Sequence, residues 1–90
     1  MSSRYKVQVT VQSVTKGECP RGFKAGDSWL IENGETPNGM CGDAYISVAP
    51  AIRLLWLGGE QPWDEDKDVT CRSCPDAAVM VVYEIRRLRP

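Results

Sequence analysis

The sequence of 90 residues contains no histidine, only one phenylalanine and no strong excess of either charge. Without histidine, the chain cannot supply a Ser-His-Asp triad, a Cys-His pair, a histidine-ligated zinc site or an imidazole switch. The 11 Lys and Arg residues against 12 Asp and Glu residues give a formal net charge of -1. A non-specific nucleic-acid binder needs a basic excess, so we expect no nucleic-acid partner.

Long hydrophobic runs are also missing. The longest mostly apolar stretch, residues 48–57, contains Pro50 and Arg53 and is far shorter than the ~20 residues that span a bilayer. The first residues show no apolar segment of the secretory type. The sequence therefore predicts a single cytoplasmic domain over residues 1–90 with no membrane partner. A core of this size is small, so a metal or a second subunit would add useful stability.

Two long segments alternate between apolar and polar residues with the period of a half-buried strand. The apolar positions of residues 5–14 are Tyr5, Val7, Val9 and Val11. Those of residues 78–88 are Val79, Val81, Tyr83 and Ile85. Shorter strands are expected at residues 28–32 and from Val69 onward. We expect the two long strands to pair near the centre of an antiparallel sheet.

Between these strands, residues 43–57 place apolar side chains three and four residues apart, which predicts one helix ending at Gly58-Gly59. Asp43 is the expected N-cap. Pro50 lies inside the segment, so either the helix kinks there or it begins at Pro50 after a short first turn. A small antiparallel sheet with one main helix packed on it and long Gly- and Pro-rich loops is an α+β fold.

The candidate metal ligands are Cys19, Cys41, Cys71 and Cys74. Cys71 and Cys74 form a C-x-x-C motif, in which a tight turn would bring both sulfurs to one side of an ion. Four thiolates suit either tetrahedral zinc or an iron–sulfur cluster. Cys19 and Cys41 form no second pair of this kind. Two alternatives therefore stay open, namely unligated thiols in and around the core, and redox or disulfide chemistry.

Other polar and aromatic residues are candidates for catalysis or ligand binding. Cys41, Asp43 and Asp76 are the catalytic candidates, and Trp63 and Asp27 are the ligand-binding candidates. A carboxylate in an apolar pocket against a tryptophan would have a raised pKa, as a catalytic acid requires. Turn or capping duty is the favoured alternative for all three aspartates.

Two charged segments are assigned structural roles. Residues 60–68 hold five acidic side chains and predict an exposed loop, with Trp63 folded back as a lid on the core. Arg86, Arg87 and Arg89 are interpreted as a solvated end of the last strand. Trp29 and Trp56 fall on apolar faces and are assigned to the core.

The order of several short motifs resembles the TIGR04076 family of small proteins, which has no established activity. The motifs are Cys19-Pro20, residues 23–27, residues 37–41, Gly58-Gly59, Pro62-Trp63 and Cys74-Pro75-Asp76. The resemblance covers residues 5–88 and implies that Cys19, Cys41 and Cys74 are family positions, with Cys71 an addition. Asp27, Trp63 and Asp76 match as well, whereas Ala77 stands where the family commonly has Gly.

Three functions compete at this point. The leading hypothesis is an accessory or binding module that holds zinc or an iron–sulfur cluster through its cysteines. The second is a small enzyme with a reactive Cys or Asp in a pocket beside the helix. The third is an oligomerisation module in which a sheet face or edge strand pairs with a second copy. The expected partner is thus a second copy or another protein.

Overall fold

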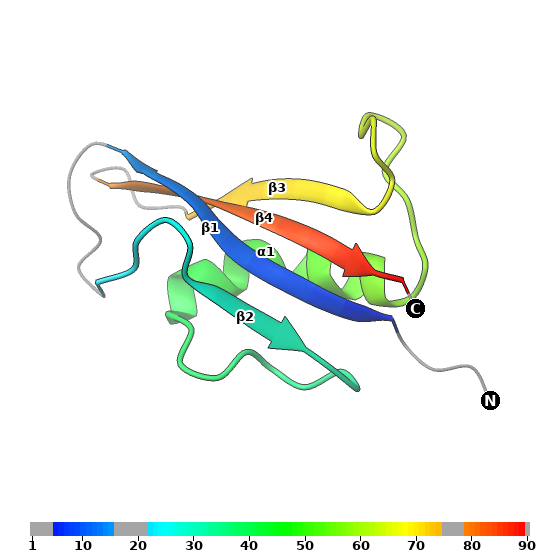
Figure 1. Ribbon diagram of the computed structural model, residues 1–90, viewed down its shortest axis with the longest axis horizontal. Coiled ribbons are helices and arrows are strands. Elements are labelled where there is room, and N and C mark those ends of the chain that lie inside the picture. Colours follow the sequence, from blue (N-terminus) through cyan, green and yellow to red (C-terminus); the bar gives the residue numbers. More distant parts are fainter. Residues whose placement is uncertain (1–4, 16–21, 75–78, 90) are drawn as a thin grey trace.

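The computed structural model describes residues 5–15, 22–74 and 79–89. Within these residues, the order of elements is β1 (Lys6–Thr15), β2 (Ser28–Ile31), α1 (Gly42–Trp56), β3 (Val69–Ser73) and β4 (Met80–Leu88). The four strands form an antiparallel sheet in the order β2-β1-β4-β3, and α1 lies against one face (Figure 1). The predicted α+β fold is confirmed, with the two long strands paired at its centre.

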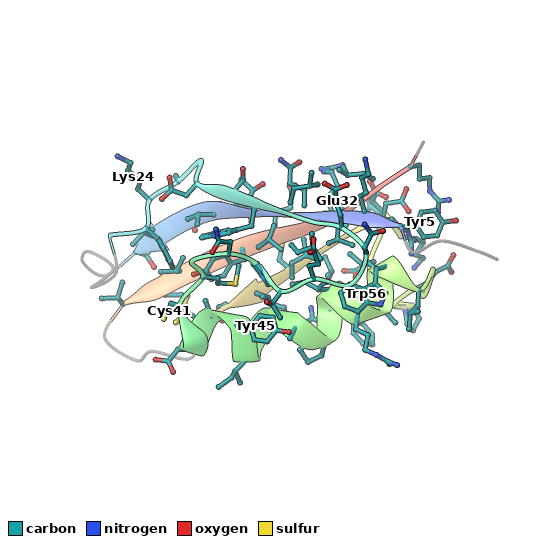
Figure 2. The ribbon with its side chains drawn as sticks, turned by 90° about the horizontal axis from the view of Figure 1, so that it is seen from below. Tyr5, Lys24, Glu32, Cys41, Tyr45 and Trp56 are labelled. Carbon is teal, nitrogen blue, oxygen red and sulfur yellow. The ribbon has the colours of Figure 1, made fainter. Side chains whose placement is uncertain are left out.

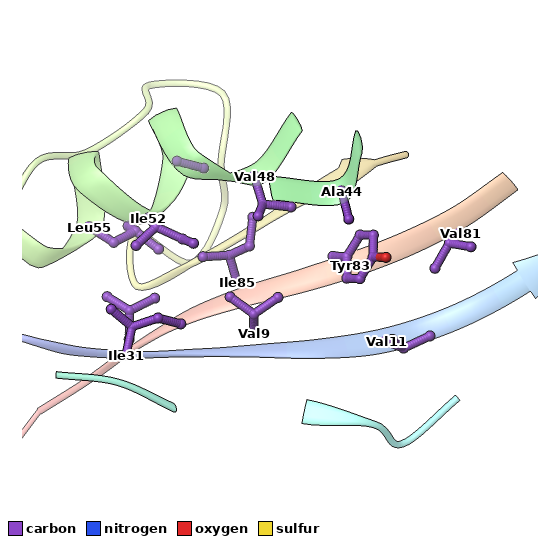
Figure 3. Packing of buried hydrophobic residues seen from close by; sticks show 12 residues of the cluster. Val9, Val11, Ile31, Ala44, Val48, Ile52, Leu55, Val81, Tyr83 and Ile85 are labelled. Atoms are coloured by element: carbon purple, nitrogen blue, oxygen red, sulfur yellow. The ribbon is translucent and has the colours of Figure 1, made fainter. Parts of the chain in front are cut away.

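Alternation along β4, and along β1 as far as Val11, builds the core between the sheet and α1. In these stretches every second side chain faces the helix, while the residues between them face away. The sheet contributes Val7, Val9, Val11, Ile31, Val81, Tyr83 and Ile85 (Figure 3). The helix contributes Ala44, Val48, Ala51, Ile52 and Leu55. The apolar stripes expected for the long strands and the helix therefore meet in one cluster.

A bulge in β1 reverses this alternation. The register of β1 against β4 shifts between Val11 and Ser13, where β1 has one residue more than its partner. The extra residue moves the following side chains to the opposite face of the strand. Val14 consequently packs against the core, although it lies an odd number of residues from Val11.

The helix starts earlier than predicted and is not interrupted by its proline. Cys41 is the N-cap and Asp43 lies in the first turn, so the assignment of Asp43 as N-cap is wrong. α1 runs through Pro50, so it does not begin at that residue. Pro50 cannot donate to the carbonyl of Ile46, but both residues are exposed and water can reach this carbonyl. Gly58 follows α1 with a φ of 85°, which suits the predicted glycine stop.

Candidate functional site

The residues predicted to form a site are divided between the two ends of α1. Cys41 directly precedes the helix, whereas Trp63 belongs to the loop that leaves its C-terminal end (Figures 1 and 2). A helix of 15 residues is ~22 Å long. Trp63 therefore does not share a pocket with the catalytic candidates Cys41 and Asp43.

The end of the sheet at which α1 begins carries two half-buried thiols. Cys41 precedes α1, Cys74 follows β3, and both side chains pack against the core. The Ser47 hydroxyl donates a hydrogen bond to the carbonyl of Ser73, which ties the start of the helix to the end of β3. The fold thus brings Cys41 and Cys74 to the same end of the molecule.

Aromatic rings cover the core near this end. Phe23 meets Trp29 edge-on, with ring centroids 5.1 Å apart, and the centroid of Trp29 is 6.3 Å from that of Tyr83. Tyr83 lies beneath Ala44, in the first turn of α1 (Figure 3). Trp29 is half-buried, and so is Trp56, which agrees with their assignment to the core. The two thiols therefore border an apolar and aromatic environment.

Cys71 lies on the other face of the sheet. It is the central residue of β3, it is exposed, and its Sγ donates to Oε1 of Gln12 at 3.5 Å. Burial of the Sγ atom, together with the negative charges of Glu84 and Asp64, raises the pKa of the thiol above 9.0. The tight turn predicted at the C-x-x-C motif is wrong because Cys71 belongs to an extended strand. Extended backbone separates the Cys71 side chain from the core face that Cys74 occupies.

The described residues provide only part of the predicted metal site. Among them, no group of three or more Cys, Asp or Glu side chains is arranged to hold a metal ion. Cys19 and Asp76 lie outside the described residues. Of the four cysteines, the described part of the chain thus places two, Cys41 and Cys74, at the end of the sheet where α1 begins.

Asp27 closes a turn, as the favoured alternative predicts. Its Oδ2 accepts the backbone N–H of Lys24 at 3.0 Å, and its own N–H donates to the Lys24 carbonyl at 3.0 Å. A bond from the N–H of Val11 to the carbonyl of Asp27 joins this turn to β1, just before β2 begins. The carboxylate of Asp27 is therefore engaged in local structure.

At the opposite end of α1, the acidic loop of residues 60–68 wraps around Lys67. The Lys67 ammonium donates to the carbonyls of Gln61 at 3.0 Å, Pro62 at 3.1 Å and Asp64. This leaves the Trp63 side chain 74% exposed, so the predicted lid is wrong. The physical reason is that the backbone of the turn faces the ammonium, which leaves Trp63 outside.

Arg87 was not expected to be structural, yet its side chain is almost fully buried beneath the end of α1. Nη1 donates to the carbonyls of Leu55 at 3.1 Å and Gly59 at 2.8 Å, and Nη2 donates to that of Lys67 at 2.9 Å. Nε donates to Oδ1 of Asp68 at 2.9 Å. The solvated end predicted for this arginine is therefore wrong. Its position two residues after Ile85, on the inward face of β4, is the signal that could have revealed it.

Asp68 accepts hydrogen bonds from two arginines, Arg87 and Arg89. Its carboxylate accepts from Nε of Arg89 at 2.9 Å, and the ring of Tyr5 lies 5.4 Å from the guanidinium carbons of both arginines. Hydrogen bonds from Arg89 and Arg87 lower the pKa of Asp68 from 3.8 to about 2. The ionised form of Asp68 therefore favours the folded state.

We expect Asp68→Asn to flatten the pH dependence of stability in acid. The lowered pKa means that the stabilisation from Asp68 is complete above about pH 4 and is lost as the pH falls towards 2. Urea unfolding at several pH values should show a steeper loss between these limits in the wild type than in the variant. Glu65→Gln, which removes an exposed carboxylate from the same loop, should keep the wild-type slope. Equal slopes for D68N and the wild type would contradict the assignment.

The two edges of the sheet are protected in different ways. Residues 32–41 run back beside β2 on their way to α1 (Figures 1 and 2). Directly after β3, the N–H of Cys74 donates to the carbonyl of Val81 in β4. Because hydrogen bonding alternates along an antiparallel strand, the backbone N–H and carbonyl groups of Cys71 and Ser73 face away from β4. The outward carbonyl of Cys71 accepts from Arg72 Nη1 at 2.8 Å, and that of Ser73 accepts from Ser47. These bonds work against edge-to-edge pairing with a second copy through β3.

Comparisons with family models, with curated proteins and with solved structures find no match. No helix among the described residues is long and apolar enough to cross a membrane. The fold alone therefore defines the class, a two-layer α+β protein with one helix on a four-stranded antiparallel sheet. The resemblance to the TIGR04076 family stays a prediction.

Proposed function

We propose that this protein is a small cytoplasmic binding module that holds a zinc ion through thiolates at the end of the sheet where α1 begins. Cys41 and Cys74 supply two thiolates, and Cys19 supplies a third. The observation that carries the proposal is the convergence of Cys41 and Cys74, from distant parts of the sequence, at one end of the core.

The topology supports Cys19 as the third ligand. β1 ends at Thr15 and β4 begins at Met80, and these two residues are partners in the sheet at the end where α1 begins. Cys19 follows Thr15 by four residues in the sequence. The same three cysteines are the positions that the family resemblance implies.

The placement of Cys71 favours zinc over an iron–sulfur cluster. A cluster ordinarily takes four thiolates, whereas Cys71 lies on the opposite face of the sheet and its pKa is raised. Zinc accepts three thiolates with one further ligand. A metal bound here would join the start of α1 to the chain segments that follow β1 and β3. It would thereby stabilise a domain whose core is small.

Zinc binding is tested on reduced protein purified without oxygen, by equilibrium dialysis with zinc and by the thiolate absorption band of bound cobalt(II). Cys19→Ser, Cys41→Ser and Cys74→Ser should each weaken binding by more than the ~10–100-fold that loss of an outer-shell partner typically costs. Cys71→Ser is the matched control and should bind as the wild type does. A stably folded protein that takes up neither metal would contradict the proposal, as would equal losses in C71S and C41S.

A further inference from the structure

Trp63 is the most exposed large hydrophobic side chain among the described residues, at 74%. Exposure of a whole indole leaves a large apolar surface in water, and tryptophan is the side chain most enriched at the centres of protein interfaces. The feature lies at the opposite end of α1 from the thiols. It is therefore independent of the zinc proposal.

The turn that carries Trp63 is held rigidly. Besides the three carbonyls bonded to Lys67, the buried side chain of Gln61 donates to Oγ1 of Thr70 at 3.0 Å and accepts from Nη2 of Arg72 at 2.8 Å. These bonds fasten the residue two positions before Trp63 to the inner face of β3. A group held in this way loses little conformational freedom when it binds a partner.

Negative charge predominates around Trp63. Glu60, Asp64, Glu65 and Asp66 lie within three residues of it, and none of them forms an ion pair within the described part of the chain. The one lysine of the loop turns its ammonium to backbone carbonyls. Four carboxylates against one ammonium therefore leave a net negative charge beside an exposed indole.

We propose that Trp63 and these four carboxylates bind an arginine- or lysine-bearing segment of a partner protein. A cationic side chain stacks on the indole face, which is the best aromatic surface for a cation, and the carboxylates attract the charge of the segment. The same negative charge repels nucleic acids and anionic membranes. A cationic polypeptide is thus the class of partner that can both stack on the indole and pair with the carboxylates.

The proposal is tested by isothermal titration calorimetry of the full chain with a short peptide of alternating glycine and arginine. The matched peptide has citrulline, which keeps the shape of arginine without its charge. We expect binding of the arginine peptide that weakens as salt is raised, and much weaker binding of the citrulline peptide. No binding of the arginine peptide, or equal affinity for both peptides, would overturn the proposal.

Three variants separate the indole from general charge attraction. Trp63→Ala should weaken binding of the arginine peptide about tenfold, and Glu65→Gln about twofold. Leu30→Ala removes an exposed apolar side chain from the sheet face that is turned away from α1, and should bind as the wild type does. If a folded W63A protein binds the arginine peptide with unchanged affinity, Trp63 has no role in recognition. Self-association that W63A abolishes would identify a second copy as the occupant instead.

The rigidity of the turn has its own test. Lys67→Met removes the ammonium and makes the loop more negative, so charge attraction alone would tighten binding of the arginine peptide. Because the same change frees three backbone carbonyls, we expect affinity to fall severalfold instead. Tighter binding in K67M would show that the braced turn contributes nothing to recognition.

Discussion

Replacing Arg87 by methionine should lower the free energy of unfolding by about 3 kcal/mol. Methionine fills a similar volume, but it leaves the carbonyls of Leu55, Gly59 and Lys67 without their donor and removes one of the two arginines on Asp68. Breaking a buried pair by removing one partner costs about 3–5 kcal/mol. We expect the cost of Arg87→Met to lie at the lower end of this range, because Asp68 still pairs with Arg89 and its side chain is 28% exposed.

The measurement is urea unfolding at neutral pH, with the slope against denaturant checked for constancy. Arg86→Met is the matched control, since Arg86 is exposed, faces away from α1 and pairs with Glu84, and its loss should cost less than about 1 kcal/mol. Arg87→Lys should recover only part of the stability, because an ammonium cannot reproduce the fork of the guanidinium. An R87M protein as stable as R86M would refute the structural role of this side chain.

Replacing Ile85 by alanine is expected to cost about 3–4 kcal/mol. Ile85 is fully buried at the centre of the sheet, beside Val9 and below Val48 of α1 (Figure 3). Removal of its side chain leaves a cavity walled by two paired strands and a helix, which cannot close around it without moving the sheet.

The control for this cavity is Val82→Ala on the same strand. Val82 is half-buried on the face away from α1, where solvent can fill the space that its methyl groups leave, so we expect a cost below about 1.5 kcal/mol. Thermal unfolding should rank the proteins as wild type, V82A and I85A, with the last at least ~10 °C below the first. An equal fall in melting temperature for V82A and I85A would mean that α1 does not exclude water from this face of the sheet.

Much of the secondary structure follows from local patterns. The alternation around Val9 and Ile85 predicted the two long strands, because one face of each strand had to be apolar and the other polar. The three- and four-residue spacing predicted α1 within one residue at either end. The small errors lie at Cys41 and Asp43, because Asp43 is the stronger capping residue by type, whereas the backbone places the N-cap at Cys41 without a capping bond from its side chain.

The candidate site was harder to predict, because a residue can belong to it only if its side chain lies on the right face of its strand or helix. Cys71 and Cys74 look like a ligand pair in the sequence, yet a strand separates their side chains. Trp63 was predicted to fold back as a lid on the core, yet the bonds of Lys67 keep it outside. Neither outcome follows from residue type, since each is set by the backbone conformation that the segment adopts in the fold.

The sequence by itself determined the fold class, the pairing of the long strands, the apolar face of the helix and the absence of any histidine-based chemistry. These depend on residue identity and on spacing along the chain, which folding does not alter. The tertiary structure alone decided that Cys41 and Cys74 lie at one end of the core, that Arg87 is buried and that Trp63 is exposed. Hydrogen bonds to the distant residues Leu55 and Gly59 hold Arg87 inside, and the path of the folded backbone around Lys67 leaves Trp63 outside.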